Sequence, residues 1–187
     1  HQPSDLETAI RRRGEKILPD RDRAIAAMEM LRRLQLSKYN HAPMSSAAAL
    51  DLPFGRDVVL VIDQTFDDAS IAGAGADSAD FAKMLNAAID ENPGLPVVVK
   101  THPEAISGAK RGYIQELARR RGITLLTRDV NPWVLIGMAR RVYVVSSQFG
   151  FEALLAGVPV TCFGASFYAG WGLTDDRFAP VRRRDVV

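Results

Sequence analysis

Polar and ionisable side chains follow several apolar runs of this chain, and they are of the kinds that bind phosphate and sugar. In the stretch from Val142 to Arg177, a short apolar run is followed by Ser146-Ser147-Gln148, and Gly150 and Glu152 come just beyond. Hydroxyls and the free N–H groups of a helix start receive phosphate, and a carboxylate accepts hydrogen bonds from ribose hydroxyls. The alternative is an ordinary helix N-cap with an acid in the first turn. The stretch is therefore a candidate nucleotide-sugar site.

A second polar group, Asp63 to Ser70, directly follows an apolar run and holds several acids beside an amide. A carboxylate at the end of a strand can act as nucleophile or base towards a sugar. Asp63, Asp67 and Asp68 are therefore candidate catalytic residues, and Gln64 is a candidate binding residue. The alternative is an acidic turn before the next helix, because Asp is common in turns.

A third polar group is Lys100-Thr101-His102-Pro103-Glu104, after the apolar run from Pro96 to Val99. The imidazole of His102 can donate to a phosphate oxygen or act as a general acid. The neighbouring ammonium of Lys100 favours an anion site in the same region. A single His is more often structural than functional, so a packing role is the competing interpretation.

The last group is the loop from residue 167 to 177, which is rich in Gly and aromatic residues. Trp171 could stack on a ring and Arg177 could pair with a carboxylate, although such aromatics also pack against domain edges. Phosphate-loop, GxGxxG, CxxC, HExxH and GxSxG motifs are absent, and the three His and single Cys are too widely spaced for a zinc site. We expect neither a metal nor a cofactor apart from a donor substrate.

The elements that position these groups alternate along the chain between short apolar runs and amphipathic stretches. The apolar runs predict strands at 58–63, 96–99, 123–126, 142–145 and 158–162. Helical spacing predicts helices at 78–90, 112–121, 132–139 and 149–156. This alternation predicts an α/β fold with a Rossmann-like parallel sheet and helices on both faces. The polar groups would then meet at the carboxyl ends of the strands, where ligands bind.

Outside this region, residues 1–56 predict a helical segment and a linker, and we place the nucleotide-sugar-binding domain at 57–187. A formal net charge of +2 does not suggest a nucleic-acid binder. No apolar run approaches the ~20 residues of a membrane span. The single Cys162 cannot form an internal disulfide, and we expect it to be buried in a cytoplasmic protein. Because the chain starts with His, we also expect it to be a piece of a longer protein.

Five segments in a fixed order carry a resemblance to a known family. They are VLVIDQTFDDASI (59–71), VVVKTHPE (97–104), DVNPW (129–133), SSQFGFEALLAGVPVTCFG (146–164) and FYAGWGLTDDR (167–177). Together they resemble the bacterial capsule polysaccharide biosynthesis proteins that are retaining β-Kdo glycosyltransferases. Before residue 57, little beyond LSKYN (36–40) shares the resemblance.

The resemblance implies transfer of the acidic sugar Kdo from CMP-Kdo to a lipid-linked capsular glycan. It also implies a two-lobed, GT-B-like fold. This chain would be the nucleotide-binding lobe with an N-terminal helical segment, and the second lobe would lie outside it. Such a protein would act at the cytoplasmic face of the inner membrane, in peripheral association with it, and would not bind nucleic acid.

Residue roles follow from the same resemblance. His102, Ser146 and Ser147 would hold the CMP phosphate, Glu152 would contact the ribose or the sugar, and Asp68 would form a covalent Kdo adduct. The family pattern has Gly where this chain has Asp67, so the choice among Asp67, Asp68 and Asp63 stays open. By charge, Lys100 and Arg177 would suit the Kdo carboxylate. Gln64, Gln148, Gly150 and Trp171 complete the expected donor site.

Two other functions remain open at this point. One is a non-catalytic nucleotide- or glycan-binding module of a capsule assembly or export complex. The other, which is less favoured, is a sugar-nucleotide epimerase of similar two-lobed build.

Overall fold

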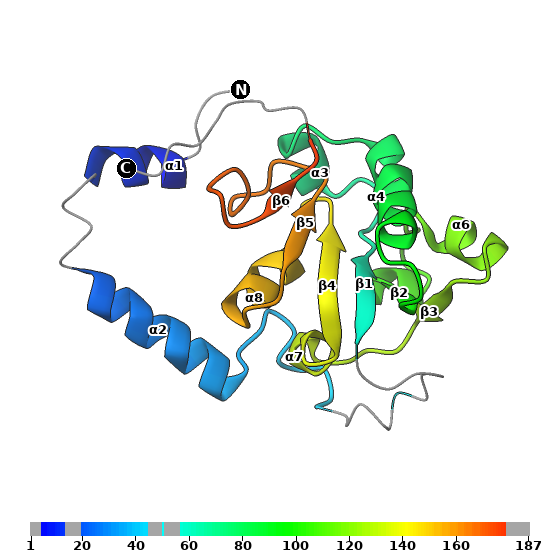
Figure 1. The fold of residues 1–187 in the computed structure, drawn as a ribbon, viewed down its shortest axis with the longest axis horizontal. Coiled ribbons are helices and arrows are strands. Elements are labelled where there is room, and N and C mark those ends of the chain that lie inside the picture. The colour runs from blue at the N-terminus through cyan, green and yellow to red at the C-terminus, as the bar shows by residue number, and fades with distance from the viewer. Residues whose placement is uncertain (1–4, 14–19, 45–49, 51–56, 179–187) are drawn as a thin grey trace.

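The computed structural model describes residues 5–13, 20–44, 50 and 57–178. Within them, one parallel sheet has the strand order β3-β2-β1-β4-β5-β6 (Figure 1). The strands are β1 (Val58–Ile62), β2 (Val97–Lys100), β3 (Thr124–Leu126), β4 (Ala139–Val144), β5 (Val160–Cys162) and β6 (Asp175–Asp176). The order reverses between β1 and β4, as in Rossmann folds. The predicted fold class is confirmed.

Helices cover both faces of the sheet because successive side chains of each strand point to opposite faces. From β1, Leu60 packs in one apolar cluster with α7 (Pro132–Ile136) and α8 (Phe149–Leu155). Its neighbour Val61 packs in the other cluster, with α3 (Ala69–Gly73), α4 (Ser78–Asp90) and α6 (Gln115–Arg120). All of β1 is buried, so its continuous apolar run reflects burial from two sides.

Local sequence determines where the longest helix of this domain begins and ends. Asp77 and Asp80 form a capping box at the start of α4, and Asn92-Pro93 follows closely on its end. The helix spans the residues expected from the sequence. Three short elements were not expected, namely α3, α5 (Pro103–Ile106) and β6. In addition, β4 begins at Ala139, inside the range where a helix was predicted.

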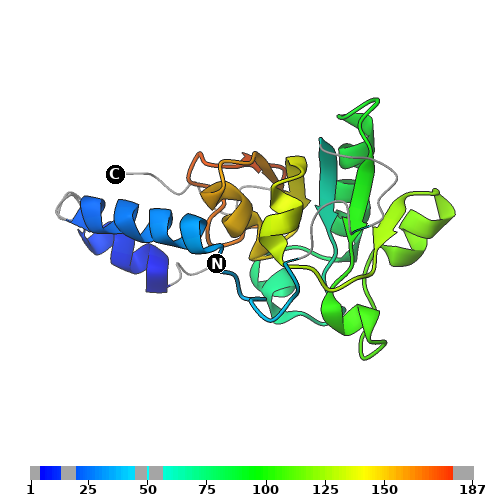
Figure 2. The same ribbon diagram turned by 90° about the horizontal axis from the view of Figure 1, so that it is seen from below.

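The N-terminal helices α1 (Asp5–Arg13) and α2 (Arg21–Leu34) lie to one side of the sheet (Figures 1 and 2). Helix α2 buries none of its residues, and most of its large apolar side chains, among them Met30 and Leu34, are exposed. None of the helices within the described ranges has the length and hydropathy that a bilayer crossing needs.

The chain after α2 returns to the sheet domain. The indole N–H of Trp133 donates to the carbonyl of Leu36 at 3.0 Å, and the N–H of Asn131 donates to the carbonyl of Pro43 at 3.1 Å. Residues 36–43 therefore pack on the domain. Residues 1–4, 14–19, 45–49, 51–56 and 179–187, which include most of the expected linker and the end of the expected domain, lie outside the described residues.

Candidate active site

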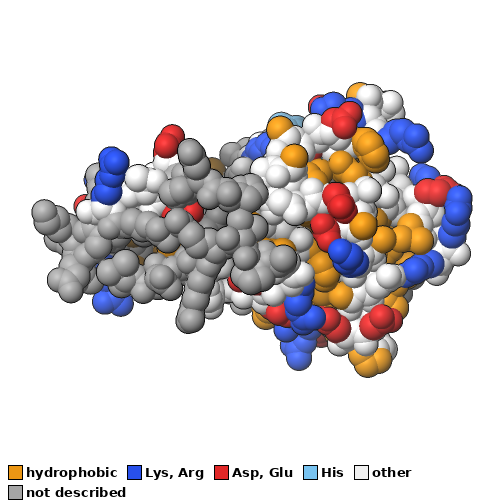
Figure 3. Space-filling view, turned by 90° about the horizontal axis from the view of Figure 1, so that it is seen from above, with side chains coloured by type: hydrophobic (Ala, Val, Ile, Leu, Met, Phe, Trp, Pro, Cys, Tyr) orange, Lys and Arg blue, Asp and Glu red, His pale blue; other side chains and the backbone are white. Residues whose placement is uncertain are grey.

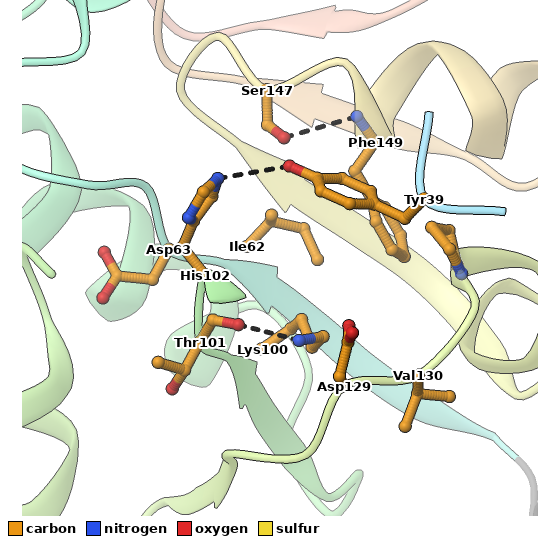
Figure 4. A pocket seen from close by; sticks show the side chains of 11 residues that line it. Tyr39, Ile62, Asp63, Lys100, Thr101, His102, Asp129, Val130, Ser147 and Phe149 are labelled. Carbon is orange, nitrogen blue, oxygen red and sulfur yellow. Dashed lines mark hydrogen bonds between the residues drawn. The ribbon is translucent and has the colours of Figure 1, made fainter. Parts of the chain in front are cut away.

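The loops that follow β1, β2 and β4 meet at a pocket beside the point where the strand order reverses (Figure 4). Part of the wall of this pocket is formed by Ile62 and Lys100, the last residues of β1 and β2. Tyr39 reaches the pocket from the N-terminal segment. Its lining residues are Tyr39, Ile62, Asp63, Lys100, Thr101, His102, Asp129, Val130, Pro132, Ser147 and Phe149. The predicted gathering of polar groups at the carboxyl ends of the strands is thus present in the structure.

Gln64 connects the loop after β1 with the loop after β4. Its Oε1 accepts the backbone N–H of Ser146 at 3.0 Å. Its Nε2 lies 3.2 Å from Ser146 Oγ, 3.3 Å from Ser70 Oγ and 3.3 Å from Asp68 Oδ2. Because these neighbours already use both ends of the buried amide, Gln64 positions Asp68 and Ser146 relative to each other.

Asp68 has the properties of an ionised carboxylate that can still reach solvent. It caps α3 by accepting the Ser70 N–H at 2.9 Å, and its side chain is half-buried. Burial alone would raise the pKa of Asp68, but hydrogen bonds from Ser70 and Gln64 and the charge of Lys38 outweigh it and lower the pKa. An ionised carboxylate is the form that a nucleophile needs.

Asp67 has a backbone role. It has φ +61°, in the left-handed region that favours Gly and that Asp tolerates better than most residues. The position where the family pattern has Gly is therefore one where the backbone requires positive φ. The side chain of Asp67 is exposed.

Asp63 is an anchor for a neighbouring loop. Its carboxylate accepts the backbone N–H groups of Gln64 (3.0 Å), Tyr113 (3.0 Å) and Ile114 (3.4 Å). Burial raises the pKa of Asp63 to about 6, against the effect of these hydrogen bonds. Figure 4 shows the carboxylate turned away from Lys100 and Ser147. Of the three candidate acids, Asp63 is therefore committed to backbone N–H groups, and the choice of nucleophile stays a prediction.

His102 presents a neutral imidazole with its proton on Nε2. Its Nδ1 accepts the backbone N–H of Glu104 at 3.2 Å, so Nε2–H donates to Tyr39 Oη at 3.1 Å (Figure 4). Burial lowers the pKa of His102, and the charges of Lys38 and Lys100 lower it further against the opposing effect of the nearby acids. At neutral pH the ring is therefore a hydrogen-bond donor towards the pocket.

Lys100 brings a positive charge to the pocket from the end of β2. Its ammonium donates to the carbonyls of Thr101 (2.8 Å) and Arg128 (3.2 Å), and the side chain is buried. Burial lowers the pKa of Lys100 to about 8, with Asp129 acting in the opposite direction. An ammonium has three donors, so one is left for an anion. Lys100 and His102 together suit a phosphate or a carboxylate.

Gly150 gives space to a tyrosine from a distant loop. A Cβ on Gly150 would lie 2.3 Å from Tyr168 Oη, and this hydroxyl donates to the carbonyl of Ser147 at 2.5 Å. The Ser147 hydroxyl accepts the N–H of Phe149 at the start of α8 (Figure 4). Gly150 thus lets Tyr168 position Ser147. Gln148 is exposed and makes no side-chain cap to this helix.

Glu152 is buried and holds the N-terminal segment. Its carboxylate accepts Ser37 Oγ–H at 3.0 and 3.1 Å and the Lys38 N–H at 3.3 Å. Burial raises the pKa of Glu152, and these hydrogen bonds oppose the shift. The role predicted for it towards the ribose or the sugar stays a prediction.

Trp171 and Arg177 do not line the pocket. The Trp171 indole donates to the carbonyl of Phe167 at 2.9 Å. Arg177 pairs with Glu91 at 2.9 Å and with Asp175 at 2.8 Å. Their expected contacts with the donor stay predictions.

Sequence reasoning missed Tyr39 and its neighbours as part of the site. These residues lie in the segment LSKYN, the one part of the first 56 residues that carried the family resemblance. That signal could have identified them, because a motif within an otherwise unremarkable segment points to a specific contact.

Charges of both signs are mixed on the face of the sheet domain that Figure 3 shows. In the view of Figure 3, Lys and Arg side chains alternate with Asp and Glu over the sheet domain, with hydrophobic side chains between them. Among the residues that the structure describes, no three His, Cys, Asp or Glu side chains gather as metal ligands. Cys162 is buried, as expected.

Comparison with known proteins yields both sequence relatives and solved structures. The chain is 43% identical, over 97% of its length, to the capsule polysaccharide modification protein LipA of Neisseria meningitidis serogroup B, of which it covers 26%. It is 36% identical to the lipopolysaccharide-processing protein LpsZ of Rhizobium meliloti over the same share of its length and covers 41% of that protein. The chain therefore spans less than half the length of these relatives.

Two solved structures of Thermosulfurimonas dismutans KpsC are similar to this one. The β-Kdo 2,4 transferase matches with a TM-score of 0.81 and 39% identity, over 94% of this chain and 54% of that one. The β-Kdo 2,7 transferase matches with a TM-score of 0.65 and 31% identity, over 97% of this chain and 53% of that one. A family model described as "Capsule polysaccharide biosynthesis protein" matches residues 11–185. The chain belongs to this capsule polysaccharide biosynthesis family.

Proposed function

We propose that this chain is the donor-binding lobe of a glycosyltransferase that transfers Kdo from CMP-Kdo to a lipid-linked capsular glycan with retention of configuration. The observation that carries the proposal is the placement of Asp68. Its ionised carboxylate does not itself line the pocket but is tied through Gln64 to Ser146, and the next residue, Ser147, lines the pocket together with His102 and Lys100. The similarity to two Kdo transferases supports the choice of sugar.

In this proposal the pocket binds the CMP phosphate. His102 donates its Nε2–H to a phosphate oxygen, which replaces Tyr39 Oη as acceptor. Lys100 supplies the positive charge and its remaining N–H, and the Ser146 and Ser147 hydroxyls lie on the adjoining loop. These groups stabilise the charge that builds up on the phosphate as the bond to the sugar breaks. The charges present suit an anionic leaving group.

Retention follows from two displacements at the anomeric carbon. A carboxylate oxygen of Asp68 attacks this carbon, and the bond to the phosphate oxygen breaks with its electron pair leaving on CMP. The acceptor hydroxyl then attacks the same carbon, loses its proton to a base, and the Asp68 carboxylate leaves. Each step inverts the configuration, so the product retains it.

Other parts of the proposal concern the rest of the protein. The acceptor glycan and the second lobe would close over the donor, since transfer requires that water be kept from the reacting centre. We place the enzyme at the cytoplasmic face of the inner membrane, where a lipid-linked acceptor would be reached.

The test uses the complete protein that contains this chain, incubated with CMP-Kdo and analysed by intact-mass spectrometry. We expect an adduct of one Kdo on the wild type and on Asp67→Asn, and none on Asp68→Asn. Tryptic mapping should place the adduct on Asp68. CMP-Kdo binding without adduct or transfer by the wild type would favour the non-catalytic binding module. An adduct on Asp68→Asn would overturn the assignment of the nucleophile.

A further inference from the structure

We propose that Lys38, which reaches the site from outside the sheet, is a further binding residue that pairs with an anionic group of the sugar nucleotide. The shared chemistry is an oxyanion, either the phosphate or the carboxylate of the sugar. The proposal rests on the proposed function and adds to it a residue from the N-terminal segment.

The segment that carries Lys38 is fixed on the domain at both ends. Leu36 is held by the indole of Trp133, and Pro43 by the backbone of Asn131. Between them, the backbone N–H of Lys38 donates to the buried carboxylate of Glu152 at 3.3 Å. The backbone of Lys38 is therefore positioned by hydrogen bonds before any ligand binds, which lowers the entropic cost of using its side chain.

Tyr39 joins this segment to the catalytic groups. It lines the pocket, and its hydroxyl lies 3.1 Å from His102 Nε2 (Figure 4). The ammonium of Lys38 lies 5.3 Å from the centroid of the Tyr39 ring, within the range of a cation–π contact. The tyrosine thus has the ammonium over its ring and the imidazole at its hydroxyl.

The charge of Lys38 acts on the site although its side chain is exposed. Burial is the largest influence on the pKa of Asp68, His102 and Glu152, and on all three the charge of Lys38 acts to lower the pKa, so the ammonium is close enough to affect them. Within the described residues, Lys38 forms no ion pair. An exposed ammonium that lies near the pocket without an ion-pair partner there is available to an incoming anion.

The donor has two anionic groups, and each needs a positive charge in the site. CMP-Kdo carries a phosphate and a sugar carboxylate, whereas Arg177, the other cation predicted for the carboxylate, is paired with Glu91 and Asp175 outside the pocket. Lys100 in the pocket and Lys38 beside it provide one positive charge for each anionic group.

The experiment measures binding of CMP and of CMP-Kdo to the complete protein by calorimetry at fixed ionic strength, with steady-state transfer kinetics beside it. The variants are Lys38→Met and Lys38→Arg. The control is Lys83→Met, because Lys83 is exposed on α4 and pairs with Asp80 outside the pocket. We expect Lys38→Met to raise the Kd for CMP-Kdo about tenfold, equal to ~1.4 kcal/mol. Lys38→Arg should stay within about threefold of the wild type, and Lys83→Met should be unchanged.

Comparing CMP with CMP-Kdo shows which anionic group Lys38 contacts, because only CMP-Kdo carries the sugar carboxylate. A loss with CMP-Kdo alone assigns Lys38 to the sugar carboxylate, and an equal loss with CMP assigns it to the phosphate; both support the proposal. Wild-type affinity for CMP-Kdo in Lys38→Met overturns it and leaves the proposed function standing. An equal loss of affinity in Lys38→Arg also overturns it. A lowered Tm of both variants in thermal unfolding would then assign Lys38 a structural role. A wild type that does not bind CMP-Kdo refutes the proposed function and this inference with it.

Discussion

Replacing Gly150 by Ala tests whether Tyr168 is the reason for this glycine. The added Cβ would lie 2.3 Å from Tyr168 Oη, 2.9 Å from Cζ and 3.1 Å from Cε2, whereas ordinary contacts begin at 3.4 Å. Tyr168 would have to withdraw by 3.4 − 2.3 = 1.1 Å. It is buried, and its hydroxyl donates to the carbonyl of Ser147 at 2.5 Å, so withdrawal strains the core and breaks this hydrogen bond.

The expected loss of stability is the balance of two unfavourable contributions and one favourable contribution. Overpacking costs ~1–3 kcal/mol. The Ser147 carbonyl keeps the backbone N–H of Gly150 as a donor at 3.1 Å, so the lost hydrogen bond from Tyr168 costs only ~0.5–1.5 kcal/mol. Helix propensity favours Ala over Gly by ~1 kcal/mol, which offsets part of the loss. We expect the free energy of unfolding to fall by about 1–3 kcal/mol, from the balance of these terms.

Urea unfolding of the protein, followed by fluorescence and circular dichroism, measures this change. Gly73→Ala is the matched control, because nothing lies within 4 Å of the added Cβ and only helix propensity changes. Tyr168→Phe removes the nearest atom, so in the double variant the two effects should fall short of their sum by about 1 kcal/mol or more. A loss below about 0.5 kcal/mol, or strict additivity, would refute the reasoning and leave Gly150 free to serve a ligand.

Four further predictions follow from particular contacts. Asp67→Gly should raise the Tm slightly and retain transfer activity, because φ is +61° there; loss of transfer with a normal fold would give the Asp67 carboxylate a catalytic role. Donor affinity should fall above about pH 8, where Lys100 loses its proton, and Lys100→Arg should abolish that fall in calorimetric titrations. The pKa of Lys100 is about 8 in the folded protein and 10.5 in the unfolded chain, so the unfolded chain binds this proton more tightly. The free energy of unfolding should therefore rise between about pH 8 and 10.5, by up to ~3 kcal/mol. A rise of equal size in Lys100→Met would contradict this. Ser37→Ala should lower the free energy of unfolding by ~1–2 kcal/mol because Glu152 loses its hydroxyl donor, whereas Ser107→Ala, exposed at the surface, should change it by less than about 0.5 kcal/mol.

Local sequence was sufficient to predict the main elements of the sheet. The continuous apolar run VVLVI predicts a strand that is buried on both faces, as β1 is. Helix α4 has a capping residue at its start and Pro shortly after its end. The helices α3 and α5 are only 5 and 4 residues long. Elements this short have too few periodic positions to be seen in a sequence, and their stability comes from the packing around them.

The site was predictable in location but not in detail. Residues at strand ends such as Gln64 and His102 could be placed together because parallel strands end at one edge. The partner of Gly150 could not, because Tyr168 lies in a loop beyond the next strand. The contact between Tyr39 and His102 joins positions 63 residues apart, and no local pattern encodes such a distance.

Residues 36–43 also bear on how the protein could be divided. A protein shortened to begin at residue 57 would keep every strand of the sheet. It would lose the hydroxyl and N–H that bind the Glu152 carboxylate, the acceptor of the Trp133 indole and the tyrosine at His102. A separate peptide of residues 20–44 carries all of these groups, so the shortened domain should act as a receptor for that peptide. The strength of the contacts between residues 36–43 and the sheet domain could then be measured as the Kd of this peptide for the shortened domain.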